Sequence, residues 1–176
     1  EKKGIILEDD CIPNLSFFKF CEIILNKYEN NYNISMVSGT NLIGKKSDLK
    51  ELSYFYSQYY NIWGWATWAD RWQRKKINIK NLKNLNIANE AYLNKSYVKW
   101  IRKAHNIHRT KDTSWAMSWF VDCLYKNTFT IVPEINLIKN IGFEGSHTIK
   151  FDTKNLNHET YDFKKLILRK KLNYDF

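Results

Sequence analysis

The chain has 176 residues, of which 44% are hydrophobic and 16% aromatic, enough to bury the core of one domain or of a large part of one. Only six glycines and two prolines exclude a collagen-like or low-complexity protein, and no apolar run approaches the roughly 18–20 residues of a membrane-spanning helix. The formal net charge of +10 is uneven, because residues 71–111 carry twelve Lys and Arg against one acid, Glu90.

The first part of the chain predicts a β-α-β order. Residues 4–7 form a short apolar run that ends in acids, which is typical of a buried strand in a parallel sheet. Residues 15–28 place apolar side chains at helical spacing after Asn14 or Ser16, either of which suits a helix N-cap. Residues 34–37 predict a second strand. This order favours an α/β fold with a largely parallel sheet.

The remaining elements continue the alternation of helices and strands. Aromatic residues crowd 53–68, where we expect a strand and a turn at Gly64. The later predicted elements are helices over residues 92–105, 115–125 and 161–172 and a strand over residues 129–132. The three cysteines are Cys11, Cys21 and Cys123. Their odd number and the absence of CxxC spacing favour buried thiols in a reducing compartment over disulfides or a zinc site.

Three consecutive acids, Glu8, Asp9 and Asp10, follow the first predicted strand. Like charges repel one another at a strand end, and burial penalises each of them, so a positive group nearby would stabilise the arrangement. Ligands in open α/β sheets bind beyond the carboxyl ends of strands, and Mg²⁺ or Mn²⁺ takes carboxylates together with phosphate oxygens. The alternative is a solvated acidic turn that interacts with the dipole of the next helix.

Two further motifs carry candidate chemistry. Tryptophans surround Gly64 in Trp63-Gly64-Trp65, which suits a wall on which a sugar ring stacks, although an ordinary core would use the same residues. His147 lies in a polar loop with small neighbours, where it could reach a metal or simply face solvent. Neither motif decides a function alone.

Taken in chain order, these motifs resemble those of a known family. They are Glu-Asp-Asp-Cys-Ile-Pro, Phe-Phe in a helix, Ser-Gly-Thr-Asn, Trp-Gly-Trp-Ala-Thr-Trp, Ser-Trp, Val-Pro, Asn-Ile-Gly-Phe and Ser-His-Thr. Over residues 4–148 the chain resembles bacterial nucleotide-sugar glycosyltransferases of the GT-A fold, similar to N-acetylglucosaminyltransferase I and to family 2 enzymes. The resemblance implies an α/β GT-A fold with a mostly parallel mixed sheet flanked by helices.

The resemblance also implies roles for single residues. Asp10 would ligate Mn²⁺ or Mg²⁺ bridging the nucleotide diphosphate, and His147 would be a second metal ligand. The nucleotide-sugar-binding residues would be Glu8, Asp9, Gly64 and Trp65. The metal would neutralise the charge that develops on the leaving diphosphate.

Two departures from the family pattern qualify these expectations. Where relatives often carry a catalytic Asp after Ser-Trp, this chain has Ala116, so we expect Asp112, about one helical turn earlier, to be the base of an inverting reaction. Asp122 ranks second, and the stereochemistry stays open. The family also begins with a nucleobase-binding part for which residues 1–150 supply no counterpart, so we expect these residues to be the C-terminal portion of a GT-A domain.

The basic segments define the expected partners. Residues 71–111, a basic and partly helical insert, and the basic helical extension within 151–176 would face an anionic glycan or lipid-linked acceptor, or the inner face of a membrane through residues 161–172. A Lys-rich solvated face is the alternative. The predicted function is transfer of a sugar from a UDP- or GDP-linked donor in the cytoplasm, during synthesis of a bacterial surface polysaccharide or lipopolysaccharide. The rival functions are a catalytically inactive GT-A remnant and, with no recognisable motif to support it, a basic nucleic-acid-binding domain.

Overall fold

The structure is a computed structural model, and its secondary structure follows the chain from β1 to β7. It describes residues 1–42, 53–73, 87, 90–110, 114–142, 159–162 and 166–168. The strands are β1 (Lys3–Ile6), β2 (Cys11–Pro13), β3 (Ile34–Ser38), β4 (Tyr54–Ser57), β5 (Trp65–Trp68), β6 (Phe129–Pro133) and β7 (Ile138–Asn140). The helices are α1 (Leu15–Lys27), α2 (Ala69–Gln73), α3 (Lys95–Thr110), α4 (Trp115–Tyr125) and a 3₁₀ turn, η3 (Glu90–Tyr92).

The main sheet has five described strands in the order β1-β5-β3-β6-β4. β3 and β6 are parallel, whereas β5 pairs antiparallel with β1 and β3, and β4 pairs antiparallel with β6. The α/β class and the mixed sheet are confirmed. The prediction of a mostly parallel sheet is wrong, because three of these four pairings are antiparallel. β1, β3 and β6 nevertheless run in the same direction, so their carboxyl ends share one edge.

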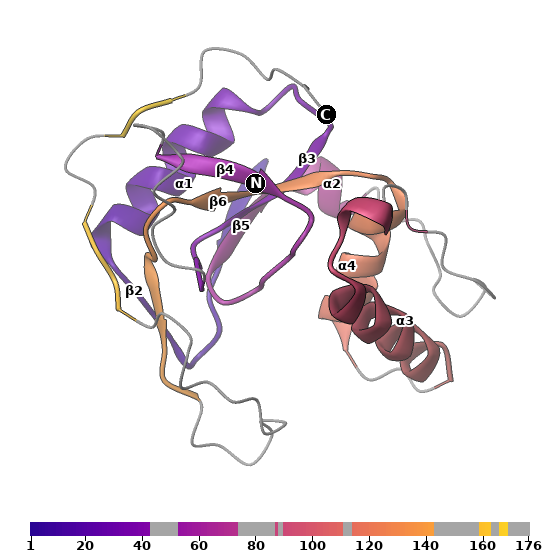
Figure 1. The fold of residues 1–176 in the computed structure, drawn as a ribbon. Helices are drawn as coiled ribbons and strands as arrows, with labels where there is room; N and C mark the ends of the chain where they lie inside the picture. Colours follow the sequence, from indigo (N-terminus) through magenta and orange to yellow (C-terminus); the bar gives the residue numbers. More distant parts are fainter. Residues whose placement is uncertain are drawn as a thin grey trace.

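Each face of the sheet carries its own hydrophobic core because neighbouring residues of a strand point to opposite faces. On β3, Val37 belongs to the core beneath α1, and Met36 belongs to the core beneath α3 and α4. On β5, Ala66 belongs to the core beneath α1 and Trp65 to the core beneath α3 and α4. Figure 1 shows α1 on one side of the sheet and α3 and α4 on the other.

Local sequence signals account for α1. Asn14 is the N-cap, and its side-chain oxygen accepts a hydrogen bond from the backbone N–H of Ser16 at 2.8 Å. Its inward face carries buried apolar residues at helical spacing, namely Phe17, Phe20, Cys21, Ile24 and Leu25. The predicted helix is therefore confirmed, and of the two candidate caps the structure uses Asn14.

β1 forms as predicted but is not buried. Among the described strands it pairs only with β5, so it lies at an edge of the sheet. The side chains of Ile5 and Leu7 are 39% and 38% exposed. The prediction of a buried strand was wrong because burial depends on neighbouring strands, and the apolar run alone does not specify them.

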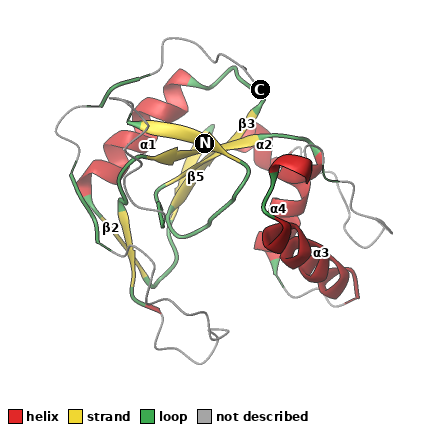
Figure 2. Ribbon diagram, in the orientation of Figure 1, coloured by secondary structure: helices red, strands yellow, loops and turns green. Residues whose placement is uncertain are grey.

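A separate two-stranded ribbon joins β2 and β7, which pair antiparallel with Cys11 opposite Asn140. Figure 2 shows this ribbon apart from the main sheet. Residues 11–13 directly follow the acidic segment. The ribbon therefore fixes the three acids between the end of β1 and the end of β7.

The described residues near the C-terminus do not form the helix expected over residues 161–172. Residues 159–162 and 166–168 are neither helix nor strand, so that prediction is wrong for these positions. Tyr161 N–H donates to the carbonyl of Asn136 at 3.0 Å, and Ser53 N–H donates to the carbonyl of Ile167 at 3.3 Å. Tyr161 and Ile167 thus form backbone hydrogen bonds with the loops next to β4 and β6, instead of bonds within a helix.

Candidate functional site

The carboxyl ends of β1 and β3 meet at the start of β5. Both strands pair with β5 antiparallel, and both Ile6 and Ser38 lie opposite Trp65. The segment after β1, the segment after β3 and the turn before β5 are therefore neighbours. This edge is where ligands bind in open α/β sheets.

Two glycines allow these connections to approach closely. Gly39 N–H donates to the carbonyl of Gly64 at 2.7 Å. A Cβ atom at Gly64 would lie 2.6 Å from Ile138 Cγ1 and 3.3 Å from Leu7, and its φ of +61° is unfavourable for other residues. Gly64, predicted to bind the nucleotide-sugar, thus lies beside the residue that precedes Glu8. Its observed role is to let three backbone segments pack together.

The acidic segment brings together three side chains that can each offer a ligand atom. The carboxylates of Glu8 and Asp10 and the thiol of Cys11 lie within 4.8 Å of one another. Cys11 N–H donates to the carbonyl of Glu8 at 3.1 Å, which turns the chain so that these side chains converge. Asp9 is exposed and lies outside this group. The structure therefore separates Asp10 and Glu8 from Asp9, which the sequence did not.

Burial and like charge both act on this group. Partial burial, followed by the charges of Asp10 and Asp9, raises the pKa of Glu8 above its ordinary value. Burial is also the main cause that raises the pKa of the Cys11 thiol to about 12. The Cys11 thiol is therefore neutral at pH 7, and the raised pKa of Glu8 reflects burial together with repulsion by its acidic neighbours. A cation between the carboxylates would relieve the repulsion.

The end of β7 closes one side of the group. Ile141 N–H donates to the carbonyl of Asp10 at 2.9 Å, and Gly142 N–H donates to the Asn140 side chain at 2.7 Å. A Cβ atom at Gly142 would lie 2.9 Å from Asp10 Cγ and closer still to its Oδ2. The Asp10 carboxylate thus lies directly against a backbone that has room for no side chain. Residues 143–150, which follow Gly142, are not described by the structure. The predicted metal ligand His147 therefore lies outside the described residues.

The donor chemistry fits a hard or borderline divalent cation. Mg²⁺ and Mn²⁺ take carboxylate oxygens and complete their coordination with water or phosphate. Glu8 and Asp10 provide two such groups within reach of one ion, and the absence of a side chain at Gly142 leaves room for the Asp10 carboxylate beside the end of β7. Cys11 and Gly142 were not assigned to the site from the sequence. The position of Cys11 next to the three acids in the sequence could have indicated its part in the site. Nothing in the sequence around Gly142 indicated that it would contact Asp10.

Trp65 lies in an aromatic cluster rather than on the acidic segment. Its side chain is 1% exposed and stacks on Trp115 at 5.9 Å between centroids. An apolar cavity of about 510 Å³ lies beside this cluster. It is lined by Trp65, Trp72 and Trp115 together with β1 residues Lys3, Gly4 and Ile6. Contact of Trp65 with a sugar stays a prediction, and the structure shows the ring as part of the core.

The predicted base, Asp112, lies outside the described residues. α4 begins three residues later at Trp115, and Ala116 is buried at 8% exposure. Asp122, the second candidate, is 2% exposed, and its Oδ2 accepts from Lys126 Nζ at 2.6 Å. The ion pair and the burial give Asp122 a structural partner inside α4, and the choice of Asp112 as the base stays a prediction.

The described cations of residues 71–111 include both a buried arginine and exposed lysines. Arg71 is buried, whereas Lys95, Lys99 and Lys103 are exposed on α3. Their spacing of four residues places these three lysines in one row along the helix. Val98 and Ile101 face the core instead. Among the described residues of the basic segment, this row of α3 is an exposed group of cations, and its contact with an anionic partner stays a prediction.

The comparisons with known proteins identify no family. No protein-family model matches the chain, and the curated proteins include no match. Across the described helices, none has the length and apolar character needed to cross a bilayer.

Proposed function

We propose that this chain is part of a metal-dependent GT-A glycosyltransferase that uses a UDP- or GDP-linked sugar. The observation that carries the proposal is the position of the Asp10 carboxylate. It lies against Gly142, within ligand distance of Glu8, beyond the carboxyl end of β1. This is an arrangement of oxygen donors suited to a divalent cation and the diphosphate that the cation would bind.

The proposed division of roles follows the geometry. Glu8 and Asp10 hold the ion, and their fixed positions come from the Cys11–Glu8 turn and the Ile141–Asp10 hydrogen bond. The ion would supply charge stabilisation for the departing diphosphate. Asp9, exposed beside them, is available to a hydroxyl of the ribose or sugar. Asp112 is the proposed base, which takes the proton of the acceptor hydroxyl.

The exposed lysine row on α3 supports an anionic acceptor. Lys95, Lys99 and Lys103 present three positive charges on one helix, and such a row attracts phosphorylated or lipid-linked glycans by long-range electrostatics. We propose an acceptor of this kind, used in synthesis of a surface polysaccharide at the inner face of a membrane.

The proposal is tested first by the affinity of the chain for Mn²⁺ alone, measured by titration calorimetry. Asp10→Asn removes one ligand charge and keeps the shape of the side chain, so we expect at least about a tenfold loss of affinity. Asp9→Asn makes the same chemical change one residue earlier, outside the ligand group, and should bind Mn²⁺ within about threefold of wild type. Equal affinities for wild type and Asp10→Asn would overturn the assignment.

A second measurement addresses the nucleotide. UDP and GDP should raise the melting temperature only when Mn²⁺ or Mg²⁺ is present, and Asp10→Asn should abolish the shift. Metal-dependent nucleotide binding without sugar transfer to any acceptor would favour the inactive remnant over the enzyme.

A further inference from the structure

A pocket of about 450 Å³ lies between the 3₁₀ turn η3 and the first half of α3. This volume is within the usual range of small-ligand pockets in proteins. Figure 1 shows α3 and β2 at opposite sides of the molecule, so the pocket is separate from the group of Glu8, Asp10 and Cys11. The pocket therefore needs an interpretation of its own.

Contacts within the fold hold the two walls of the pocket in place. Arg102 on α3 forms an ion pair with Glu90 on η3, which joins the two walls. Leu93 N–H donates to the carbonyl of Glu90 at 3.0 Å. The side-chain oxygen of Asn94 accepts from the N–H of Ser96 at 2.8 Å and so caps the first turn of α3. The pocket is thus formed without a ligand.

The pocket combines an apolar floor with a cationic rim. Leu93 and Val98 line it, are 8% and 7% exposed, and belong to the core beneath α3 and α4. Lys95 and Lys99 also line it and are exposed. They lie one helical turn apart on the same side of α3. The ion pairs among the described residues include neither lysine, so both ammonium groups are available to an anion.

Charge complementarity and the floor together indicate the ligand. Glu90 offsets one of the three cations that line the pocket, which leaves two positive charges. A phosphate monoester carries about 1.5 to 2 negative charges at pH 7 and forms charge-assisted hydrogen bonds with ammonium groups. A neutral sugar would leave both lysines without a counter-charge, and inorganic phosphate would leave the apolar floor to water. A phosphate monoester on a hydrocarbon chain matches both parts of the pocket.

We propose that the pocket between η3 and α3 binds the phosphate monoester headgroup of a membrane lipid. Lys95 and Lys99 contact the phosphate, and the first carbons of the lipid lie over Leu93 and Val98. Lysines attract an anionic membrane without selecting a headgroup, whereas this pocket selects the monoester. The proposal rests on the proposed function only in placing the chain at a membrane, and the metal site takes no part in it.

The first test is calorimetric titration of the chain with octyl phosphate, below the concentration at which this amphiphile forms micelles. Inorganic phosphate offers the anion alone, and octanol offers the hydrocarbon alone. We expect octyl phosphate to bind at least about tenfold more tightly than either, because it alone covers the floor and neutralises the lysines. Equal affinities for octyl phosphate and inorganic phosphate would overturn the proposal.

Two matched variants distinguish the pocket from the lysine row. Lys99→Gln removes a charge from the rim and should weaken octyl phosphate binding by at least about tenfold. Lys103→Gln makes the same change one turn further along the row, at a residue that does not line the pocket, and should bind within about threefold of wild type. Equal losses in the two variants would assign the phosphate to the row and overturn the proposal.

Asp10→Asn keeps this proposal apart from the proposed function. This variant should bind octyl phosphate like wild type while losing affinity for Mn²⁺, so each proposal can fail without the other. A parallel loss of octyl phosphate binding in Asp10→Asn would place the lipid phosphate at the metal site and overturn the assignment to the pocket.

Vesicles test whether the ligand is a lipid headgroup. Phosphatidic acid carries a phosphate monoester, whereas the phosphate of phosphatidylserine is a diester. In sedimentation with vesicles matched in surface charge, wild type should prefer phosphatidic acid by at least about threefold, and Lys99→Gln should lose that preference. Equal binding of wild type to the two kinds of vesicle would show that the membrane acts only through its charge, and would overturn the proposal.

Discussion

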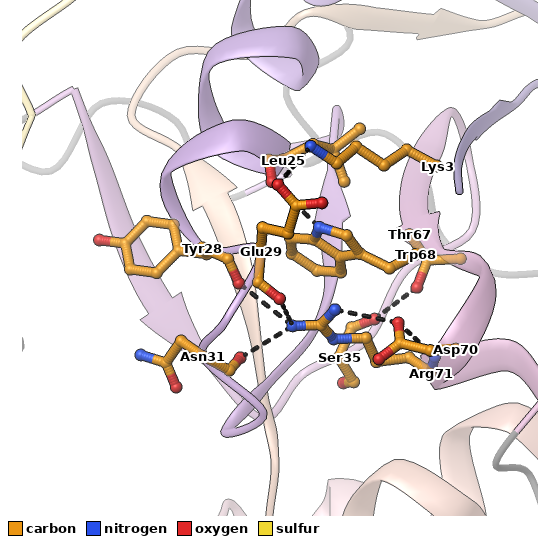
Figure 3. Close-up of polar contacts among 10 residues, drawn as sticks. All are labelled: Lys3, Leu25, Tyr28, Glu29, Asn31, Ser35, Thr67, Trp68, Asp70 and Arg71. Atoms are coloured by element: carbon orange, nitrogen blue, oxygen red, sulfur yellow. Dashed lines mark hydrogen bonds and ion pairs between the residues drawn. The ribbon is translucent and has the colours of Figure 1, made fainter. Parts of the chain in front are cut away.

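The guanidinium of Arg71 lies over the ring of Trp68, with 4.0 Å between its Cζ atom and the ring centroid. The same group binds the segment that follows α1, because its Nη2 donates to the backbone carbonyls of Tyr28, Glu29 and Asn31. Figure 3 shows these three hydrogen bonds beside the Trp68 indole, whose N–H donates to the carbonyl of Leu25 at 3.0 Å. One arginine thus joins β5 and α2 to the end of α1, and so fixes the helix that packs beneath the sheet.

Arg71→Ala is expected to destabilise the fold by about 3 kcal/mol, because it removes three hydrogen bonds to backbone carbonyls and a buried cation from an aromatic ring. The carbonyls of Tyr28 and Asn31 keep their backbone donors, the N–H groups of Asn31 and Ile34. Urea unfolding followed by tryptophan fluorescence measures the change. Lys19→Ala is the matched control, since Lys19 makes an exposed ion pair with Glu22, and it should cost less than about 1 kcal/mol. Similar losses in the two variants would contradict the structural role of Arg71.

The helices α1 and α4 could be predicted from sequence because their signals are local. The spacing of Phe17, Cys21 and Ile24 defines the buried stripe of α1, and the apolar run from Trp115 defines α4. The directions and neighbours of the strands were harder to predict from the sequence. β5 inserts between β1 and β3 and pairs antiparallel with both, and no periodicity within a strand specifies its neighbours.

The acidic segment illustrates the same limit for the site. Three acids after an apolar run indicated a ligand position, and the structure places two of them in one group. The contact between Asp10 and Gly142 depends on the β2–β7 ribbon, whose strands have three residues each and include Pro13. Strands this short carry almost no pattern, so the sequence could not predict which part of the chain closes the site.

Gly142→Ala is expected to lower the affinity for Mn²⁺ by about tenfold, because its methyl group would overlap the Asp10 carboxylate and displace it. Calorimetric titration of the metal measures this effect without depending on activity. Gly4→Ala adds the same methyl group where no atom lies within 4 Å and should bind Mn²⁺ like wild type. Unchanged affinity in Gly142→Ala would show that Asp10 does not hold the ion in this position.

Glu8 should make stability depend on pH in the absence of metal. Burial and the neighbouring charges of Asp10 and Asp9 raise the pKa of Glu8 in the folded state above its ordinary value of 4.5. The contribution of Glu8 to stability is therefore complete below that value and is lost as the pH rises through the raised folded pKa. Glu8→Gln avoids this loss, so it should be more stable than wild type near pH 7, and the difference should vanish below about pH 4.

Melting temperatures recorded in the presence of a chelator measure the effect of Glu8. Glu22→Gln is the control, because Glu22 is exposed on α1 and pairs with Lys19; it should show no gain near pH 7. A Glu8→Gln variant that is less stable than wild type at neutral pH would mean that a favourable partner of the carboxylate outweighs the repulsion.

The lysine row of α3 should dominate contact with anionic membranes. Replacing Lys95, Lys99 and Lys103 with Gln removes three charges from one helix face, and at about 1 kcal/mol per lysine near the surface the partition coefficient should fall at least about tenfold. Sedimentation with phosphatidylserine vesicles measures it. The control replaces Lys19, Lys27 and Lys139, which are also exposed but lie on α1 and β7. Because both triple variants lose the same net charge, an equal loss in the control would assign binding to overall charge, whereas a loss confined to the first variant assigns it to α3.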